Sequence, residues 1–167
     1  REPFASAPAA GGMSVVRRAT RADMPAILEL LRELATFEKL TPPDGAAYAR
    51  LVRDLGQRFD VFVALEDGKA IGYAMFYETY SSFSGKPRLW LEDMYVSPAH
   101  RQQGVGKELM REVAREAVKR GCSKATWVVL DWNTEAQKMY DKLGGEKQPW
   151  LWYEMSAENL QRMAQPG

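Results

Sequence analysis

The residues of this chain best suited to chemistry form a glycine-containing turn, Arg101-Gln102-Gln103-Gly104-Val105-Gly106. An apolar run at 89–96 precedes the turn, and an amphipathic stretch at 107–120 follows it. A turn from a strand into a helix presents backbone N–H groups without helical partners, beside the positive end of the helix dipole. Glycine has no β-carbon, so it lets phosphate oxygens approach the backbone. The turn therefore predicts a site for the pyrophosphate of a phosphorylated cofactor.

Two familiar phosphate-binding motifs do not match this turn. A Walker A loop has the pattern G-x-x-x-x-G-K-[ST], but Arg101 stands at the first glycine position and Glu108 follows Gly106-Lys107. A dinucleotide fingerprint has the pattern G-x-G-x-x-G, but Leu109 stands at the third glycine position. These mismatches exclude both classes of nucleotide-binding motif. The pattern that remains is R-x-x-G-x-G after a strand.

A second motif lies roughly thirty residues later, at 132–145, where Asn133 precedes a helical stretch and Tyr140 follows two turns on. Together the two motifs resemble the GNAT N-acetyltransferase superfamily, in which the turn is the acetyl-CoA pyrophosphate signature. The resemblance is greatest to the diamine (spermidine/spermine) acetyltransferase branch and its thialysine-acetylating relatives. It runs from about Val16 to Gly144, and it is carried by Arg18-Ala19-Thr20, Glu33-Leu34-Ala35, Leu91-Glu92-Asp93, and Asn133 with Tyr140.

The elements expected from the sequence alternate between strands and helices. Period-two and apolar runs predict strands at 15–19, 59–65, 70–79, 87–96, 123–131 and 148–153, with a hairpin turn at 66–68. Helical periodicity predicts helices after the cap Thr20, at 41–56, 105–120 and 134–143, and a short one from Ser156. Interleaved elements of this kind imply an α/β fold, a mixed sheet with helices on both faces. The resemblance implies the GNAT form of that fold, with a mostly antiparallel sheet.

The chain is expected to hold one domain, at 13–167, with residues 1–12 as a disordered extension or a cloning remnant. Its net charge of +1 gives no reason to expect a nucleic-acid partner. No apolar run approaches the ~20 residues that a membrane span needs. Cys122 is the only cysteine, so no intrachain disulfide can form, and a reducing, cytoplasmic compartment is expected. His100 has no ligand partners in its surroundings, and no metal site is expected.

Acetyl transfer to an amine requires a group that removes a proton from the amine and a group that protonates the leaving thiolate. The candidate base is Glu92, which strand alternation places on one face with Met94, while Leu91 and Asp93 share the other. A carboxylate inside a strong strand needs partners, and ion pairing at a solvated sheet opening would explain Glu92 equally well. The candidate acid is Tyr140, whose residue type alone fits a core aromatic; its spacing from Asn133 favours the catalytic role.

For the cofactor, the resemblance implies that main-chain groups at Met94, Tyr95 and Val96 contact the pantetheine arm of acetyl-CoA. Asn133 would contact the arm where the two central strands splay, with Ala136 beside it. The pyrophosphate would be surrounded by the residues of the turn: Arg101, Gln102, Gln103, Gly104, Val105, Gly106 and Lys107. A cation such as Lys107 is disfavoured at a helix start unless an anion sits there.

For the acceptor, the resemblance points to Phe37 and Glu38, and Glu38 could join Glu92 and Asp93 in an acidic groove that Trp127 lines. One departure matters. The diamine branch carries an acidic pair shortly before its final tryptophan strand, whereas this chain has the shorter segment 146–150. A short diamine, a lysine-like amino acid or another small amine is therefore as plausible an acceptor as a long polyamine.

The expected function is transfer of acetyl from acetyl-CoA to a primary amine of a small cationic substrate, by direct attack in a ternary complex. A protein lysine or N-terminal acetyltransferase is one alternative, and a non-catalytic CoA-binding module is another. Retention of both Glu92 and Tyr140 argues against the latter. The resemblance and the aromatic residues Trp150, Trp152 and Tyr153 also imply a homodimer.

Overall fold

The computed structural model describes residues 14–165 of the 167-residue chain. These residues form two compact units that divide after Leu130. The expected extension at 1–12 lies outside the described residues, and a single domain over 13–167 remains a prediction.

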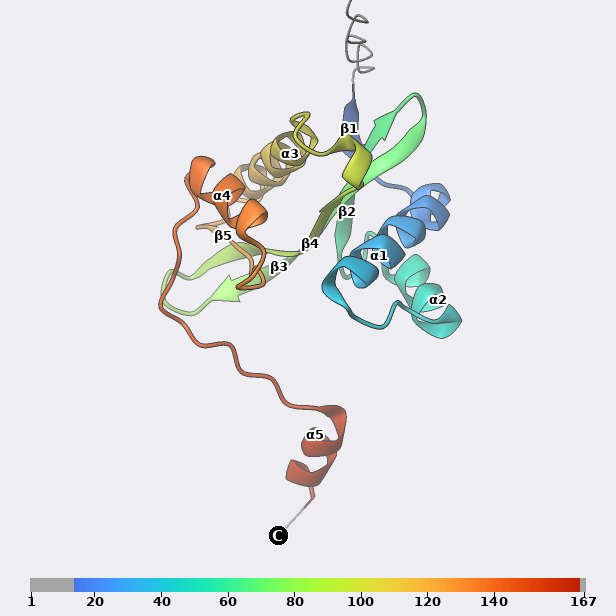
Figure 1. The fold of residues 1–167 in the computed structure, drawn as a ribbon. Coiled ribbons are helices and arrows are strands. Elements are labelled where there is room, and N and C mark those ends of the chain that lie inside the picture. Colours follow the sequence, from blue (N-terminus) through green and yellow to red (C-terminus); the bar gives the residue numbers. More distant parts are fainter. Residues whose placement is uncertain (1–13, 166–167) are drawn as a thin grey trace, which may run out of the picture. The chain divides into compact units, whose positions relative to one another are not determined.

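The first unit is built around a five-stranded sheet with the order β1-β2-β3-β4-β5 (Figure 1). Neighbouring strands are antiparallel except β4 and β5, which are parallel. The sheet is therefore mixed and mostly antiparallel, as predicted. The elements are β1 (Val15–Arg18), η1 (Arg21–Asp23), α1 (Met24–Glu38), α2 (Gly45–Asp54), β2 (Asp60–Glu66), β3 (Lys69–Ser81), β4 (Lys86–Val96), η2 (Pro98–His100), α3 (Val105–Lys119) and β5 (Ala125–Thr126).

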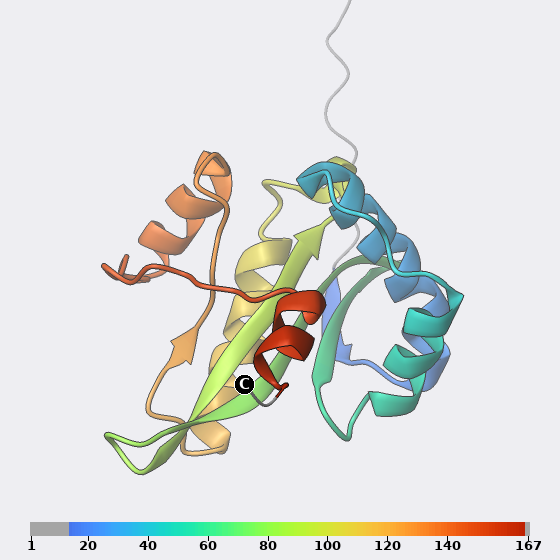
Figure 2. The ribbon, with the colours of Figure 1, turned by 90° about the horizontal axis from the view of Figure 1, so that it is seen from below.

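Helices cover both faces of this sheet, which confirms the predicted layering (Figure 2). Alternation along β2 sends Val61 and Val63 into a core beneath α1 and α2, and it sends Phe62 and Ala64 into a second core beneath α3. Each core is apolar on its own, so the sheet is held from both sides by hydrophobic burial. We call these two sides the α1 face and the α3 face.

The turn between β2 and β3 consists of Asp67 and Gly68, with φ of 49° and 76°. Glu66 pairs with Lys69 across it. Two successive positive φ angles define a type I′ hairpin, for which Asp-Gly is a preferred sequence. The predicted hairpin is confirmed.

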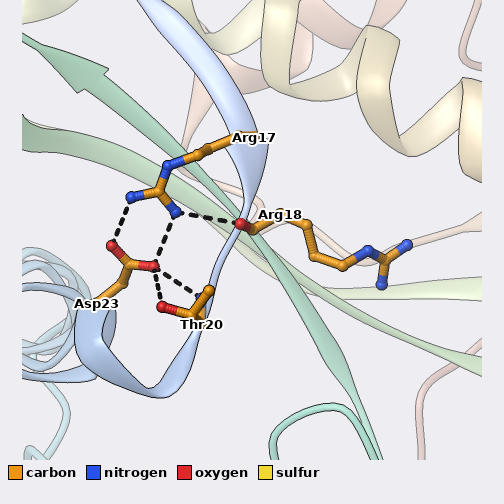
Figure 3. A network of polar contacts seen from close by, with 4 residues as sticks. All are labelled: Arg17, Arg18, Thr20 and Asp23. Carbon is orange, nitrogen blue, oxygen red and sulfur yellow. Dashed lines mark hydrogen bonds and ion pairs between the residues drawn. The ribbon is translucent and has the colours of Figure 1, made fainter.

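The first helical segment is fixed by a polar network around Asp23 (Figure 3). The Asp23 carboxylate accepts hydrogen bonds from the Thr20 amide at 2.7 Å and from the Arg17 guanidinium at 2.8 Å. The hydrogen bond to Arg17 holds the pKa of Asp23 well below its usual range. The predicted cap at Thr20, with help from Asp23, is therefore confirmed. The structure adds Arg17, a partner of the Asp23 carboxylate that the sequence did not predict.

Strand β4 carries a bulge at Glu92. Asp93 pairs with Met75 and Leu91 pairs with Phe76, so Glu92 is an extra residue with no partner on β3. A bulge breaks strict alternation, and the side chains beyond it therefore change faces. Leu91 belongs to the α3-face core, whereas Tyr95 belongs to the α1-face core.

The predicted strand at 123–131 is wrong in its extent. Strand β5 spans only Ala125–Thr126, and its pairing with β4 ends at Trp90, just before the bulge. Residues 128–130 are exposed. Their apolar sequence suggested a buried strand, but the two strands part where β4 distorts.

The second unit contains two helices, α4 (Thr134–Lys142) and α5 (Ala157–Met163). Both predicted helices are confirmed. The predicted strand at 148–153 is wrong, because residues 131–165 contain no strand. Aromatic residues favour strands, but a strand also needs a neighbour with which to pair, and Trp150, Trp152 and Tyr153 are exposed.

Gly72 lets β3 and β4 pack closely beside residues 94–96. A β-carbon there would lie 2.8 Å from the Tyr95 carbonyl oxygen, which is main chain and cannot rotate away. We expect Gly72→Ala to lower the free energy of unfolding by roughly 1–3 kcal/mol, the usual cost of overpacking. Thermal denaturation measures this loss. Gly45→Ala is the matched control, because nothing lies within 4 Å of its added β-carbon; equal melting temperatures for the two variants would contradict the prediction.

Candidate active site

The glycine-containing turn has the geometry of an anion site. Gln102 and Gly104 both adopt left-handed backbone angles, with φ of 60° and 86°, and α3 begins at the next residue. No side chain caps the first turn of α3, so its N–H groups remain available to a bound anion. A β-carbon added at Gly104 would meet no protein atom within 4 Å. The space over the turn is therefore open, which fits a pyrophosphate.

The side chains of the turn divide into structural and free groups. Val105 is buried with Leu109 in the α3-face core, so only its main chain could serve a cofactor. The Gln103 side chain donates a hydrogen bond to the Ala99 carbonyl at 2.9 Å. Lys107 is exposed at the start of α3, and its positive charge near the helix N-terminus is favourable only beside an anion.

Arg101 is engaged within the protein. Its Nε donates a hydrogen bond to the Val96 carbonyl at 2.9 Å. Its guanidinium lies 5.1 Å from the centre of the Phe37 ring and 5.4 Å from that of Tyr95. Both distances are within the range of cation–π attraction.

Three carboxylates gather near the α1 face. Burial raises the pKa of Asp93, and the nearby charges of Glu92 and then Glu38 raise it further. Across residues 14–165, no ion pair joins a Lys or Arg to any of them. Glu38 also ends α1, where the helix dipole disfavours negative charge. Such an arrangement is unfavourable by itself and is suited to a bound cation.

Glu92 is held by two donors. Its Oε2 accepts hydrogen bonds from the Trp90 indole at 2.6 Å and from the Tyr77 hydroxyl at 3.0 Å. Burial and the Glu92 carboxylate raise the pKa of Tyr77 to about 12, so this phenol stays protonated as a donor. The carboxylate is thus oriented rather than free to rotate, although the residue itself is exposed.

Asp93 is the most perturbed acid of the group. Burial, followed by the charges of Glu92 and Glu38, raises its pKa to about 6. The Tyr73 hydroxyl beneath it opposes this shift. That hydroxyl is buried without a hydrogen bond of good geometry, and burial and the Asp93 charge raise its own pKa well above the ordinary value. Strongly perturbed acids of this kind are concentrated at functional sites.

Comparisons with known proteins decide the family. Residues 24–145 match the acetyltransferase (GNAT) family. The chain belongs to the GNAT acetyltransferase family. Mouse thialysine N-ε-acetyltransferase is 33% identical over 164 residues, which cover 89% of this chain and 96% of the mouse protein.

Two further similarities support the assignment. The human spermidine/spermine N(1)-acetyltransferase-like protein 1 is 31% identical over 89% of this chain and 23% of its own length. A solved aminoglycoside N-acetyltransferase in complex with CoA is 26% identical, with a TM-score of 0.75; the match covers 89% of this chain and 98% of that chain. The chain is therefore an acetyltransferase with the GNAT fold.

The face assignment made from strand alternation is wrong. Leu91 and Asp93 do not share a face, because the bulge at Glu92 intervenes. Glu92 bonds to Tyr77 on the α1 face, whereas Met94 packs against the α3-face core. Because of the bulge, Glu92 and Asp93 of this GNAT chain lie on the same face of the sheet instead of on opposite faces.

The other predicted site residues divide among three places. Phe37 and Tyr95 pack in the α1-face core, whereas Met94, Val96 and Trp127 pack against the α3-face core. Trp127 is thus not brought to the α1 face with the acids. Asn133, Ala136 and Tyr140 belong to the second unit, where the Asn133 side chain accepts a hydrogen bond from the Ala136 amide at 3.2 Å and begins α4. Tyr140 is half-buried on that helix.

Sequence reasoning missed the residues that orient the acids. Tyr73 and Tyr77 come from β3, and their relation to β4 depends on the register between the strands. Trp90 could have been found from the sequence as a partner of Glu92, because it lies two residues earlier on the same strand.

Residues 14–165 contain neither a cluster of metal-binding side chains nor a membrane-spanning helix. No group of three or more His, Cys, Asp or Glu side chains could hold a metal ion. No helix in that range is long and apolar enough to cross a membrane.

We expect the Asp93 carboxyl to titrate with a midpoint near pH 6, because burial and two neighbouring carboxylates disfavour its charge. Carbon-13 NMR of the carboxyl group measures this directly. Tyr73→Phe should move the midpoint upward, because the hydroxyl that lowers the pKa of Asp93 is removed.

Tyr77→Phe is the matched control. It deletes the same atom on the same face, but from a tyrosine that donates to Glu92, so the Asp93 midpoint should change less. A wild-type midpoint near 4, or a downward shift in Tyr73→Phe, would show that Asp93 and Tyr73 are not coupled as described.

Proposed function

We propose that this GNAT enzyme transfers acetyl from acetyl-CoA to a primary amine of a small cationic substrate, such as a diamine, a polyamine or a lysine-like amino acid. The observation that carries the proposal is a set of three carboxylates, Glu38, Glu92 and Asp93, for which residues 14–165 supply no Lys or Arg ion pair. Primary amines titrate near ~10 and are cations at neutral pH. An ammonium group compensates the mutual repulsion of the carboxylates, which an uncharged acceptor would leave in place. The names of the thialysine and spermidine/spermine relatives agree with a cationic acceptor.

The proposed cofactor site lies at the turn. The open space over Gly104 and the uncapped first turn of α3 support a pyrophosphate at 102–107. Main-chain groups at 94–96 hold the pantetheine arm, because β4 and β5 part beyond Trp90 and leave this edge of β4 without a strand partner. The family resemblance alone adds Asn133 and Ala136 of the second unit as proposed contacts of the cofactor.

The proposed reaction is direct attack in a ternary complex. The amine nitrogen forms a bond to the thioester carbon as the bond from that carbon to sulfur breaks. Before the attack, Glu92 removes one proton from the ammonium group, directly or through water, and passes it to solvent. As the amide forms, the nitrogen loses a second proton to Glu92, while Tyr140 donates its hydroxyl proton to the sulfur and is then reprotonated by solvent. Hydrogen bonds from Trp90 and Tyr77 keep the Glu92 carboxylate in one orientation, which pre-organises this transfer.

Phe37, Glu38, Glu92 and Asp93 are the proposed acceptor contacts, whereas Trp127 packs against the α3-face core and is not among them. The shorter segment at 146–150 lacks the acidic pair of the diamine branch. The three carboxylates are therefore enough to bind a substrate that has one ammonium group besides the reacting nitrogen. The additional ammonium groups of a long polyamine would find no further carboxylates and would add less to its affinity.

An amine panel assayed for CoA release tests this function. It should contain short diamines, polyamines, lysine analogues, aminoglycosides, and peptides with free lysines or N-termini. Turnover of small cationic amines is the expected result. Turnover of peptides alone would favour a protein acetyltransferase, and CoA binding without any turnover would favour a non-catalytic module.

Gly104→Val tests the cofactor site. A branched side chain fills the space that is open above the turn, so the affinity for CoA should fall by about tenfold or more, equivalent to 1.4 kcal/mol. Calorimetry measures the dissociation constant. Gly56→Val carries the same left-handed strain, roughly 1–2 kcal/mol, at a glycine with φ of 77° and open surroundings. It should bind CoA normally; unchanged affinity in Gly104→Val would remove the pyrophosphate assignment.

Tyr140→Phe tests the proposed acid. Turnover of an amine found in the panel should fall about 10²–10⁴-fold, the usual contribution of general acid catalysis. Cofactor affinity should change far less, because the hydroxyl is needed as charge develops on sulfur. If Tyr140 only packs, the melting temperature should drop while turnover stays near normal. That outcome would assign protonation of the thiolate to water or another residue.

We also propose a cytoplasmic homodimer with no nucleic-acid partner. The single cysteine and the net charge of +1 support the compartment and the lack of nucleic acid. The exposed side chains of Trp150, Trp152 and Tyr153 support self-association. Light scattering at micromolar concentrations should give twice the chain mass, and a monomer throughout would refute the dimer.

A further inference from the structure

Arg101 is the first residue of the R-x-x-G-x-G pattern, and its side chain makes three separate contacts within the protein. It bonds to the Val96 carbonyl at the end of β4, and it lies over the rings of Phe37 and Tyr95. A residue that only neutralised a phosphate would not need two aromatic rings beneath its guanidinium. These contacts instead connect the start of the turn to α1.

Phe37 places that connection next to the acidic group. It immediately precedes Glu38, the last residue of α1, and the chain then turns through Lys39 in the left-handed conformation. Phe37 is therefore the neighbour, within α1, of the residue that carries the Glu38 carboxylate. Arg101 holds one face of Phe37, at 5.1 Å from the ring centre.

A second set of contacts joins the same two segments. Ser97 donates a hydrogen bond to the Glu33 carboxylate on α1 at 2.8 Å. After burial, the Glu33 carboxylate is the main influence on Tyr95, and it raises the pKa of that phenol. Segment 95–101 is thus attached to α1 at Glu33 as well as at Phe37. Packed contacts of this kind can transmit a positional change from one ligand site to another.

We propose that Arg101 is a positioning residue that couples cofactor binding at the turn to the amine-binding end of α1. The inference rests on the proposed function. Binding of CoA at 102–107 fixes the backbone from which Arg101 extends, and the ordered guanidinium holds Phe37 and, through it, Glu38. Acceptor binding then meets an acidic group that the cofactor has already organised.

Hydrogen exchange measured by mass spectrometry, with and without saturating CoA, tests the coupling without an amine. The reporters are the amides of Lys39 and Leu40, which bond to the Thr36 and Ala35 carbonyls at the end of α1. In the wild type, CoA should slow their exchange by about fivefold or more, the lower limit of typical coupling between sites. Arg101→Met should lose this effect while residues 102–107 are still protected by CoA.

Phe37→Leu removes the aromatic face from the other end of the contact and should give the same loss. Arg111→Met is the control, because Arg111 lies on α3 and pairs with Glu108 instead of an aromatic ring; it should behave as the wild type. Protection at 39–40 that persists in Arg101→Met, or that is missing in the wild type while 102–107 is protected, would overturn the coupling. If Arg101→Met, but not Phe37→Leu, loses the protection at 102–107, Arg101 is a phosphate ligand, and the proposed coupling is overturned as well. If CoA protects nothing in the wild type, the proposed function fails instead.

Discussion

One extra residue in β4 determines the geometry of the acidic site. Without the bulge at Glu92, strand alternation would send Asp93 to the α3 face with Leu91. With the bulge, Asp93 turns to the α1 face, where Glu38 and Glu92 act on it. The same distortion ends the pairing of β4 with β5 at Trp90. A bulge re-aims side chains and terminates strand pairing, so the position of Asp93 and the unpaired edge of β4 both lie at the same local irregularity.

The carboxylates of the first unit divide into two kinds. Asp60 and Glu116 are paired with Arg18 and Arg120, at distances of 2.5–2.8 Å. Burial alone would raise the pKa of Asp60 and Glu116, but hydrogen bonds to the arginines bring both below their ordinary values. This cluster joins β1 and β2 to α3, and its role is structural.

Glu38 and Asp93 are perturbed in the opposite direction, because burial is not offset by any cation. The folded-state pKa of Asp93 lies above its ordinary value of 3.8, so the fold loses stability as pH rises from about 4 through about 6. Asp93 and Glu38 thus differ from the Asp60 cluster in having no arginine partner, and the cationic acceptor of the proposed function would supply the missing positive charge.

The sequence by itself determined most features that depend on short-range pattern, although the helix predicted at 41–56 begins only at Gly45, after the cap Asp44. The turn at 101–106, the hairpin at Asp67-Gly68, the cap at Thr20 and the α4 start at Asn133 each follow from local backbone chemistry within a few residues. Periodicity likewise gave the α/β layering, since alternation along β2 sorts side chains between two cores. The resemblance supplied the candidate roles, which local pattern could not assign.

Only the tertiary structure decided what depends on pairing between distant segments. The bulge exists because Leu91 and Asp93 pair with adjacent residues of β3, and no property of β4 alone reveals that register. For the same reason the strands expected at 123–131 and 148–153 shortened or did not form: apolar sequence favours a strand, but a neighbouring strand must be present to pair with it. The orientation of Glu92 by Tyr77, and the contact of Arg101 with Phe37, join residues 15 and 64 positions apart. Such contacts are set by packing, which a one-dimensional pattern does not contain.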